Sequence, residues 1–425
     1  MTSIALAAGP APSAASSVTT EPRRADNVVY LDHHAATPLL PRVAAAMRAA
    51  LEHGWANPSS VHAAGRQARR LLEESREQIA QALGARPANV VLTSGGTEAC
   101  NLGLLGQCGL FGQRGLGGHG RSGAKRVLTT SCEHPAVSSC LEHLARTQGI
   151  DVATLQLPRG RPPDTAEFDA ALGQGVDLVA LQWVNHETGT VLPLENYLER
   201  CNARGVPSFV DATQALGKLR FDFGRLGATA AAVASHKIGG PPGAGAVCLR
   251  RNVELASTSW GGSQERGRRA GSPDLVAVAG FAAACSAIED RVATMGRIRR
   301  LRDELEANLL GRGAQVNGGD YLRVDTVSNV SIEGGRSDEL VAAMDLAGVC
   351  VASGAACSSG VVRASAVVGA MYPDEPWRAA SALRFSLGPE TQRSDMQAAV
   401  GAFTRVVAPM APYPAESCSQ QRAAR

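Results

Sequence analysis

Short apolar runs of β-type residues alternate with helical patterns through much of the chain, and this alternation constrains the fold more than any other feature. The stretch RQARRLLEESREQIAQALG (66–84) is one such helical pattern. Alternation of this kind indicates an α/β fold with a mostly parallel sheet. Groups that bind a ligand are then expected just beyond the ends of the strands. The expected strands are NVVLTS (89–94), RVLTTS (126–131), VDLVALQWV (176–184), PSFVDA (207–212), ATAAAVAS (228–235) and GAGAVCLR (243–250).

A change of pattern after about residue 275 indicates a second, smaller part. At 425 residues, the chain exceeds what one compact core usually serves. A long helical run at 279–311 is followed by β-type runs at 326–332 and 383–388. We therefore expect a smaller α+β lobe after the large α/β unit.

The charge balance and the cysteines exclude several classes of protein. Lys and Arg number 42 against 39 Asp and Glu, a formal net charge of +3, and no basic run indicates a nucleic-acid surface. The ten cysteines form no CxxC pair and no Cys/His zinc spacing, which disfavours disulfides and a structural metal and favours a reducing cytosol. No apolar run approaches the roughly 18 residues of a membrane span. We expect small molecules or proteins as partners, no nucleic acid and no membrane.

Both ends of the chain have the composition of tails. The N-terminal stretch is rich in Ala, Ser and Pro, has no charged region before its short apolar run, and is interrupted by Pro10 and Pro12. A secretory signal is therefore not expected. We expect 1–27 to be disordered and 408–425 to be a flexible tail.

The segment TSGGTEACN (93–101) follows an expected strand and opens a helix. Gly95 and Gly96 let the backbone approach a ligand closely, and the free N–H groups of a helix N-terminus favour an anion. Thr97 adds a hydroxyl. Glycines before a helix are also common in simple turns, so this segment alone does not establish phosphate binding.

The segment VDATQALGK (210–218) delivers Asp211 to the end of an expected strand, and Gln214 follows three residues later. Both side chains can then face one crevice. The alternative is that Asp211 caps a helix that begins at Ala212.

Lys237 lies in SHKIGGPPGAGA (235–246), beside His236 and at the end of another apolar run. A lysine here is a surface charge if taken alone. Together with an anion cradle and a strand-end aspartate, it matches the needs of a pyridoxal phosphate enzyme: a Schiff-base lysine, an acid for the pyridine nitrogen and a phosphate site.

Cys357 lies in VASGAACSSGVVRA (351–364), among Gly, Ala and Ser. A free cysteine usually packs as a small apolar residue, and this run offers no large neighbour to bury it. A small-residue turn is the simple explanation. A loop on which a reactive cysteine moves is the other.

Ten blocks together resemble the cysteine desulfurase family, which is related to the class V aminotransferases. The resemblance covers nearly everything between the tails and implies a fold type I pyridoxal phosphate enzyme. It places a large cofactor-binding domain at 43–292 and a small domain at 28–42 and 293–407. The blocks are YLDHHAATP, NPSSVHAAGR, TSGGTEACN, CEHPAV, VNHETG, VDATQALGK, SHKIGGPPGAGA, QERGRRAGS, SGAACSSG and LRFSLG.

The resemblance assigns cofactor roles to several residues. Lys237 binds pyridoxal 5'-phosphate covalently, Asp211 pairs with the pyridine nitrogen, and Gln214 donates to the phenolic oxygen. His134 stacks on the ring and shuttles protons. The phosphate site is implied to consist of Gly96, Thr97, Ser235 and His236, with Ser272 reaching the phosphate of a neighbouring subunit in a homodimer.

The resemblance also implies the reaction and its partners. Asn185 and Arg384 meet the carboxylate of L-cysteine. Cys357 takes the sulfur as a persulfide, leaves L-alanine, and passes the sulfur to an acceptor or scaffold protein. The implied purpose is iron–sulfur cluster assembly or another thio-modification.

Two positions depart from the family pattern. The Ser or Thr expected three residues before the lysine is Ala234, which removes one phosphate hydrogen bond of about 1 kcal/mol. The Asn-Asn-Glu block reads Asn185, His186 and Glu187, so His186 lies where an Asn near cofactor and substrate is usual. We expect Glu133 and Glu187 to orient backbone or histidines.

The alternatives are a selenocysteine lyase or another class V pyridoxal enzyme, and a degenerate scaffold that binds a sulfur-relay partner without turnover. The scaffold is motivated by Ala234 and His186. Retention of Lys237, Asp211 and Cys357 disfavours it.

Overall fold

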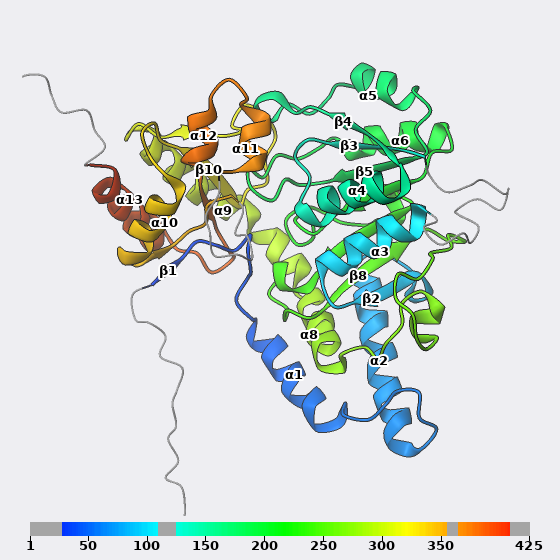
Figure 1. Cartoon of the computed structure of the whole chain (residues 1–425). Coiled ribbons are helices and arrows are strands. Elements are labelled where there is room, and N and C mark those ends of the chain that lie inside the picture. Colours follow the sequence, from blue (N-terminus) through cyan, green and yellow to red (C-terminus); the bar gives the residue numbers. More distant parts are fainter. Residues whose placement is uncertain (1–27, 109–124, 355–363, 409–425) are drawn as a thin grey trace, which may run out of the picture.

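The computed structural model describes residues 28–108, 125–354 and 364–408, and the largest sheet within them has seven strands (Figure 1). Their order is β2-β8-β7-β6-β5-β3-β4, and every neighbouring pair is parallel except the two that include β8. The predicted mostly parallel sheet is therefore confirmed. The strands are β2 Val90–Thr93, β3 Arg126–Thr130, β4 Asp151–Leu155, β5 Leu178–Gln182, β6 Ser208–Asp211, β7 Ala230–Ala234 and β8 Gly245–Leu249.

Each of the six predicted strand runs contains a strand, whereas β4 was not predicted. Strand β4 pairs only with β3 at the edge of the sheet, and its side chains are partly exposed. An edge strand with the mixed sequence DVATL lacks the continuous apolar run of strands that are buried on both faces.

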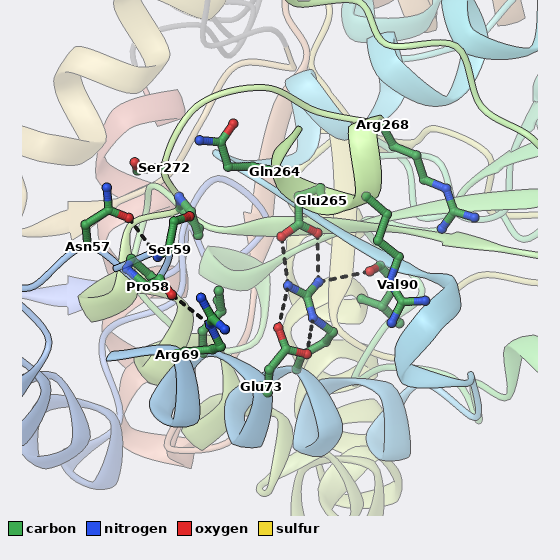
Figure 2. A pocket seen from close by; sticks show the side chains of 14 residues that line it. Asn57, Pro58, Ser59, Arg69, Glu73, Val90, Gln264, Glu265, Arg268 and Ser272 are labelled. Atoms are coloured by element: carbon green, nitrogen blue, oxygen red, sulfur yellow. Dashed lines mark hydrogen bonds and ion pairs between the residues drawn. The ribbon is translucent and has the colours of Figure 1, made fainter. Parts of the chain in front are cut away.

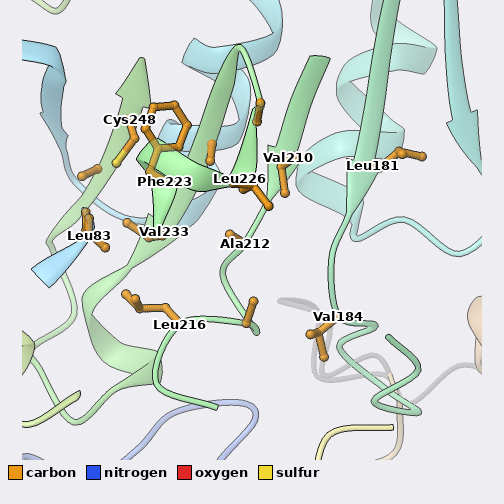
Figure 3. Close-up of a cluster of buried hydrophobic side chains, with 14 of the residues drawn as sticks. Leu83, Leu181, Val184, Val210, Ala212, Leu216, Phe223, Leu226, Val233 and Cys248 are labelled. Carbon is orange, nitrogen blue, oxygen red and sulfur yellow. The ribbon is translucent and has the colours of Figure 1, made fainter. Parts of the chain in front are cut away.

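Side chains on the two faces of this sheet enter two different core clusters. In β2, Val90 and Leu92 belong to one cluster and Val91 to the other. The same alternation places Val210 and Phe209 of β6 in different clusters, as expected where successive side chains point to opposite faces. Figure 3 shows part of the first cluster, with Val210, Val233 and Cys248.

Helices accompany the sheet, and their ends follow ordinary sequence signals. The side chain of His134 caps α4 and Pro135 occupies its first turn, while Gly149 ends it with φ of 66°. Asp164 and Glu167 form a capping box at α5. The helices are α1 Pro41–His53, α2 Ala63–Ala82, α3 Gly96–Cys108, α4 Pro135–Gln148, α5 Thr165–Leu172, α6 Leu194–Ala203, α7 Phe223–Leu226 and α8 Leu275–Cys285.

A three-stranded antiparallel sheet forms the core of the second part, in the order β12-β10-β9. Helices α9, α10 and α13 pack with it around a third cluster of buried residues. Strands β1 and β11 form a separate parallel pair. The elements are β1 Val29–Tyr30, α9 Ile288–Leu310, β9 Gln315–Val316, β10 Val327–Ser331, α10 Ser337–Leu346, β11 Val349–Cys350, α11 Ala366–Met371, α12 Pro376–Ala380, β12 Leu383–Ser386 and α13 Arg393–Val407.

The helical run predicted at 279–311 is two helices, α8 and α9, and not one. The hydroxyl of Ser286 donates to the carbonyl of Ala283, and Ser286 is the C-cap of α8. A serine that bonds back to the preceding turn bends or ends a helix. The apolar helix α8 packs against α1 and α2, whereas α9 packs against α13.

Some expectations fall outside the described residues. These are the tails, except for Ala408, and Cys357, which the sequence predicts to be the nucleophile. In the ranges that are described, no helix is both long and apolar enough to cross a membrane, and no His/Cys/Asp/Glu group has the arrangement of a metal site.

A buried ion pair fixes the loop that contains QERGRRAGS (Figure 2). Arg76 of α2 donates to both carboxylate oxygens of Glu265, at 2.7 and 2.8 Å, and Glu265 also accepts from the Leu92 amide. Glu265 and Arg266 both have left-handed φ values, 48° and 61°, which strain residues other than glycine. The ion pair therefore stabilises a strained turn.

We expect Arg76→Met to lower the free energy of unfolding by about 3–5 kcal/mol, because it leaves the Glu265 carboxylate buried without its partner. Urea unfolding measures this change. The double variant Arg76→Met/Glu265→Gln retains no unpaired charge and should recover much of the loss. If the loss of unfolding free energy in the double variant equalled the sum of the losses in the two single variants, the role of the ion pair would be contradicted.

Candidate active site

A cavity of about 320 Å³ opens where β5, β6 and β7 end. Its wall also includes the N-terminus of α3 and the cap of α4. The expectation that ligand-binding groups lie beyond the strand ends is therefore confirmed. The lining residues are Ser94, Gly95, Gly96, Thr97, Glu98, Cys100, His134, Ala136, Gln182, Val184, His186, Asp211, Thr213, Gln214, His236, Lys237, Pro242 and Gly243.

The first turn of α3 forms one wall of this cavity. Gly95 has φ of 152°, a backbone conformation that side chains rarely allow. A Cβ at Gly96 would lie 3.2 Å from the Cβ of Ala234 and 3.4 Å from Oγ1 of Thr213, so little space is left there. The first amides of a helix have no partner within the helix. They are therefore available to an anion, as is the hydroxyl of Thr97.

Lys237 follows β7, at the end of a short 3-10 turn, Ser235–Lys237. Its Nζ donates to the carbonyl oxygens of His34 at 2.5 Å and Ala35 at 2.9 Å. Burial, followed by the charge of Arg384, lowers the pKa of Lys237 to about 8. A lysine with such a pKa supplies a nucleophilic amine near neutral pH.

Asp211 ends β6 and is 6% exposed. Its Oδ1 accepts from the Thr213 amide at 2.9 Å, within a turn and not at the start of an α-helix. The alternative of a helix that begins at Ala212 is therefore wrong. Gln214 donates to the carbonyl of His34 and accepts from Lys218, both within 2.9 Å. Gln214 thus retains one amide hydrogen for a ligand.

The imidazole rings of His134 and His186 both line the cavity and lie edge to face, with ring centroids 4.9 Å apart and planes at 77°. Nδ1 of His134 accepts from the Ala136 amide at 3.0 Å. The proton of neutral His134 is therefore on Nε2. Burial lowers the pKa of His134, so this neutral form dominates at pH 7.

His236 lines the cavity, but Ser235 does not. The Ser235 side chain is fully buried and points toward Gly240, where an added Cβ would lie 2.1 Å from its Oγ. The Oγ of Ser235 has no hydrogen-bond partner among the described residues, and its role in cofactor binding stays a prediction. Burial and the neighbouring lysines, Lys237 and Lys218, lower the pKa of His236 to about 4.

Asn185 and Arg384 lie behind the cavity wall and do not line it. The oxygen of Asn185 accepts from the amides of Glu187 and Thr188, and its nitrogen donates to the carbonyl of Cys132. Asn185 is thus committed to the turn after β5. Its predicted contact with the substrate carboxylate stays a prediction.

Arg384 of β12 donates to the Asp32 carboxylate at 2.7 Å and to the carbonyl of His186 at 2.9 Å. Its side chain is buried, and its Nε has no hydrogen-bond partner among the described residues. The guanidinium therefore contributes positive charge immediately behind His186.

Ser272 lies in a different hollow, which Gln264 and Arg268 also line (Figure 2). The structure therefore does not bring it to the cavity of its own chain. Cys357 lies outside the described residues, between Gly354 and Arg363.

Sequence reasoning missed several polar residues of the site, among them Ser94 and Glu98 of the α3 N-terminus, and some of the others had a visible signal. Gln182 is the one polar side chain in the apolar run LVALQ, and Thr213 lies between Asp211 and Gln214. Lys218 is the last residue of the same segment, VDATQALGK; it is buried and donates to Gln214. Cys100 on α3 gave no signal.

These residues fit pyridoxal phosphate. The cavity brings together an amine of lowered pKa, a buried carboxylate, a face of imidazole and a helix N-terminus with free amides. Each matches one part of the cofactor: the aldehyde, the ring nitrogen, the ring face and the phosphate. Fold and cavity together are those of a fold type I pyridoxal phosphate enzyme.

Comparison with known proteins identifies the family. The pattern of the Aminotransferase class-V family matches residues 29–399. An IscS-like cysteine desulfurase of Mycobacterium tuberculosis is 38% identical over 387 residues, which cover 90% of this chain and 96% of that protein. The chain belongs to the cysteine desulfurases, a family of pyridoxal phosphate enzymes within the class V aminotransferases.

Solved structures agree with this assignment. A NifS-like protein superposes with a TM-score of 0.81 at 26% identity, covering 90% of this chain and 99% of that one. A structure described as SspA in complex with cysteine has a TM-score of 0.71 at 26% identity, covering 85% of this chain and 99% of that one.

We expect attachment of pyridoxal phosphate to the cofactor-free protein to accelerate with pH and to be half-maximal near pH 8. The Lys237 amine is nucleophilic only when unprotonated, and its pKa is lowered to about 8. Stopped-flow absorbance measures the rate, and Lys237→Ala, which should form no borohydride-stable label, is the control. A midpoint near 10.4, the ordinary lysine value, would contradict the burial effect.

Proposed function

We propose that this enzyme converts L-cysteine to L-alanine and takes the sulfur as a persulfide on Cys357, from which it passes to an acceptor protein. The observation that best supports this proposal is that Lys237, Asp211 and the N-terminus of α3 all line one cavity of a protein that belongs to the cysteine desulfurases. The neighbour described as a complex with cysteine supports the choice of substrate.

Residues of the cavity would hold pyridoxal 5'-phosphate. Lys237 would bind it covalently, Asp211 would pair with the ring nitrogen, and His134 would cover the ring. Gly96, Thr97 and His236 would hold the phosphate, with Gln214 at the phenolic oxygen. When bound, the cofactor supplies an electron sink for charge that develops at the substrate α-carbon.

The residues of the chain would then act in order. Lys237 Nζ removes the proton from the substrate α-carbon. The Cys357 thiolate attacks the substrate sulfur, so that an S–S bond forms and the C–S bond breaks. A proton returned to the carbon skeleton completes L-alanine. Arg384 and Asn185 would meet the substrate carboxylate, and Asn185 also fixes the turn that carries His186.

We also propose a homodimer, in which Ser272 would complete the phosphate site of a second copy. Ser272 lines a different hollow and not the cavity of its own chain, which supports this proposal. Large apolar side chains on this side of the chain support an interface, since Trp55 is 78% exposed and Val61 is 85% exposed.

We also propose the domain boundaries 43–292 and 28–42 with 293–407. The third core cluster supports them, because its buried members are Leu31 and residues from Ile298 to Val407. A cytosolic location is supported by the eight free cysteines of the described residues. The acceptor would belong to iron–sulfur cluster assembly or to another thio-modification.

Single-turnover formation of alanine from L-cysteine tests the proposal. We expect a purified protein that is yellow, forms alanine, and releases sulfide when a reductant is added. Cys357→Ala and Lys237→Ala should both lose alanine formation, by roughly 100-fold or more, since each removes a group that acts on the reacting atoms.

The outcomes separate the alternatives. Equal alanine from native and Cys357→Ala protein would refute the persulfide mechanism. Turnover of selenocysteine but not of cysteine would indicate a selenocysteine lyase. A colourless protein without turnover would indicate a scaffold.

A further inference from the structure

The backbone of His186 is held firmly beside the cavity. Asn185 fixes the turn by accepting from the Glu187 and Thr188 amides. The carbonyl of His186 accepts from Arg384 at 2.9 Å and from Nδ1 of His34 at 3.3 Å. The imidazole lines the cavity, and the residue is only 9% exposed.

The two ring nitrogens of His186 have different surroundings. Nε2 lies 3.7 Å from Oε1 of Glu187. Nδ1 is buried and has no hydrogen-bond partner in the described part of the chain. A carboxylate beside one nitrogen of an imidazole favours the proton on that nitrogen. Nδ1 is then an acceptor with a free lone pair.

Glu187 is itself held in place. The hydroxyl of Ser365 donates to its Oε2, and an added Cβ at Gly354 would lie 1.8 Å from that oxygen. Burial raises the pKa of Glu187, while Ser365 and Arg384 oppose the rise. The carboxyl group therefore cannot turn away from His186 without losing the Ser365 bond.

The neighbouring imidazole is not equivalent. Nδ1 of His134 already accepts from the Ala136 amide, so His134 can donate from Nε2. Accepting a second proton at Nδ1 would break the cap of α4. Of the two facing rings, only His186 has a vacant acceptor.

We propose that His186 is a further catalytic residue, which takes a proton from the α-ammonium group of bound L-cysteine. This inference rests on the proposed function. An N–H bond of the ammonium breaks, the proton passes to Nδ1 of His186, and the electron pair stays on nitrogen as a free amine. The proton returns to the amine of L-alanine before release.

The groups around His186 set its resting charge. Burial lowers its pKa well below the ordinary value, and His134, Arg384 and Lys237 act in the same direction. The ring is therefore neutral at pH 7, with the Nδ1 lone pair unprotonated, and a protonated ring would readily release its proton again. His34 is also buried and uncharged, because burial lowers its pKa. Glu187 is the acidic group that offsets the charge His186 acquires.

His186→Asn tests the proposal, because asparagine is the usual family residue here and carries no titratable group. We expect kcat/KM for L-cysteine to fall about 100-fold at pH 7, in the range of general-base effects. The ratio of native to variant kcat/KM should fall about tenfold per pH unit, because at higher pH more of the L-cysteine already has an unprotonated α-amine. Exposed His143, replaced by Asn, is the matched control.

NMR of the cofactor-free protein gives a second readout that does not depend on turnover. With ¹⁵N-labelled histidine, the His186 ring, identified among nine histidines by its loss in His186→Asn, should carry its proton on Nε2. A proton on Nδ1, or a native-to-variant ratio that does not change with pH, would overturn the proposal. Native protein that forms no alanine refutes the proposed function itself.

Discussion

Three adjacent parallel strands, β5, β6 and β7, end at the same edge of one sheet, and the site depends on this constraint. Parallel strands are buried on both faces, so polar side chains are excluded until the strand ends. Gln182, Asp211 and Lys237 therefore emerge together although they are far apart in sequence. Strand β8, which is antiparallel, connects this edge to β2, from whose end α3 begins.

Electrostatics at that edge are dominated by burial of positive charge. Lys218 and Lys237 share the region with Arg384, and desolvation lowers the pKa of both lysines. Asp32 pairs directly with Arg384. The cationic groups near Asp211 suit a cavity whose proposed ligands, a phosphate ester and an amino acid carboxylate, are anions.

The fold was largely predictable, because its central strands are continuous apolar runs that an α/β arrangement requires. What escaped prediction depends on local context: β4 is a half-exposed edge, and a serine that bonds back to the preceding turn lies at the break between α8 and α9. In the site, Lys237, Asp211, Gln214 and His134 were placed correctly in one cavity.

The remaining residues of the site could not be placed from sequence. The direction of the Ser235 side chain is set by the 3-10 turn that follows β7, and the hydrogen bonds of the Asn185 amide are those of a turn. Arg384 lies behind His186 because of pairing between β10 and β12, which no local pattern encodes.

The strained turn at Glu265 and Arg266 has a consequence for association. Its conformation is already determined within one chain by Arg76 and by the Leu92 amide. A molecule that docks against this loop therefore meets an ordered surface, and little conformational entropy is lost on contact. Strain within the chain would thus act as preorganisation for any partner that binds here.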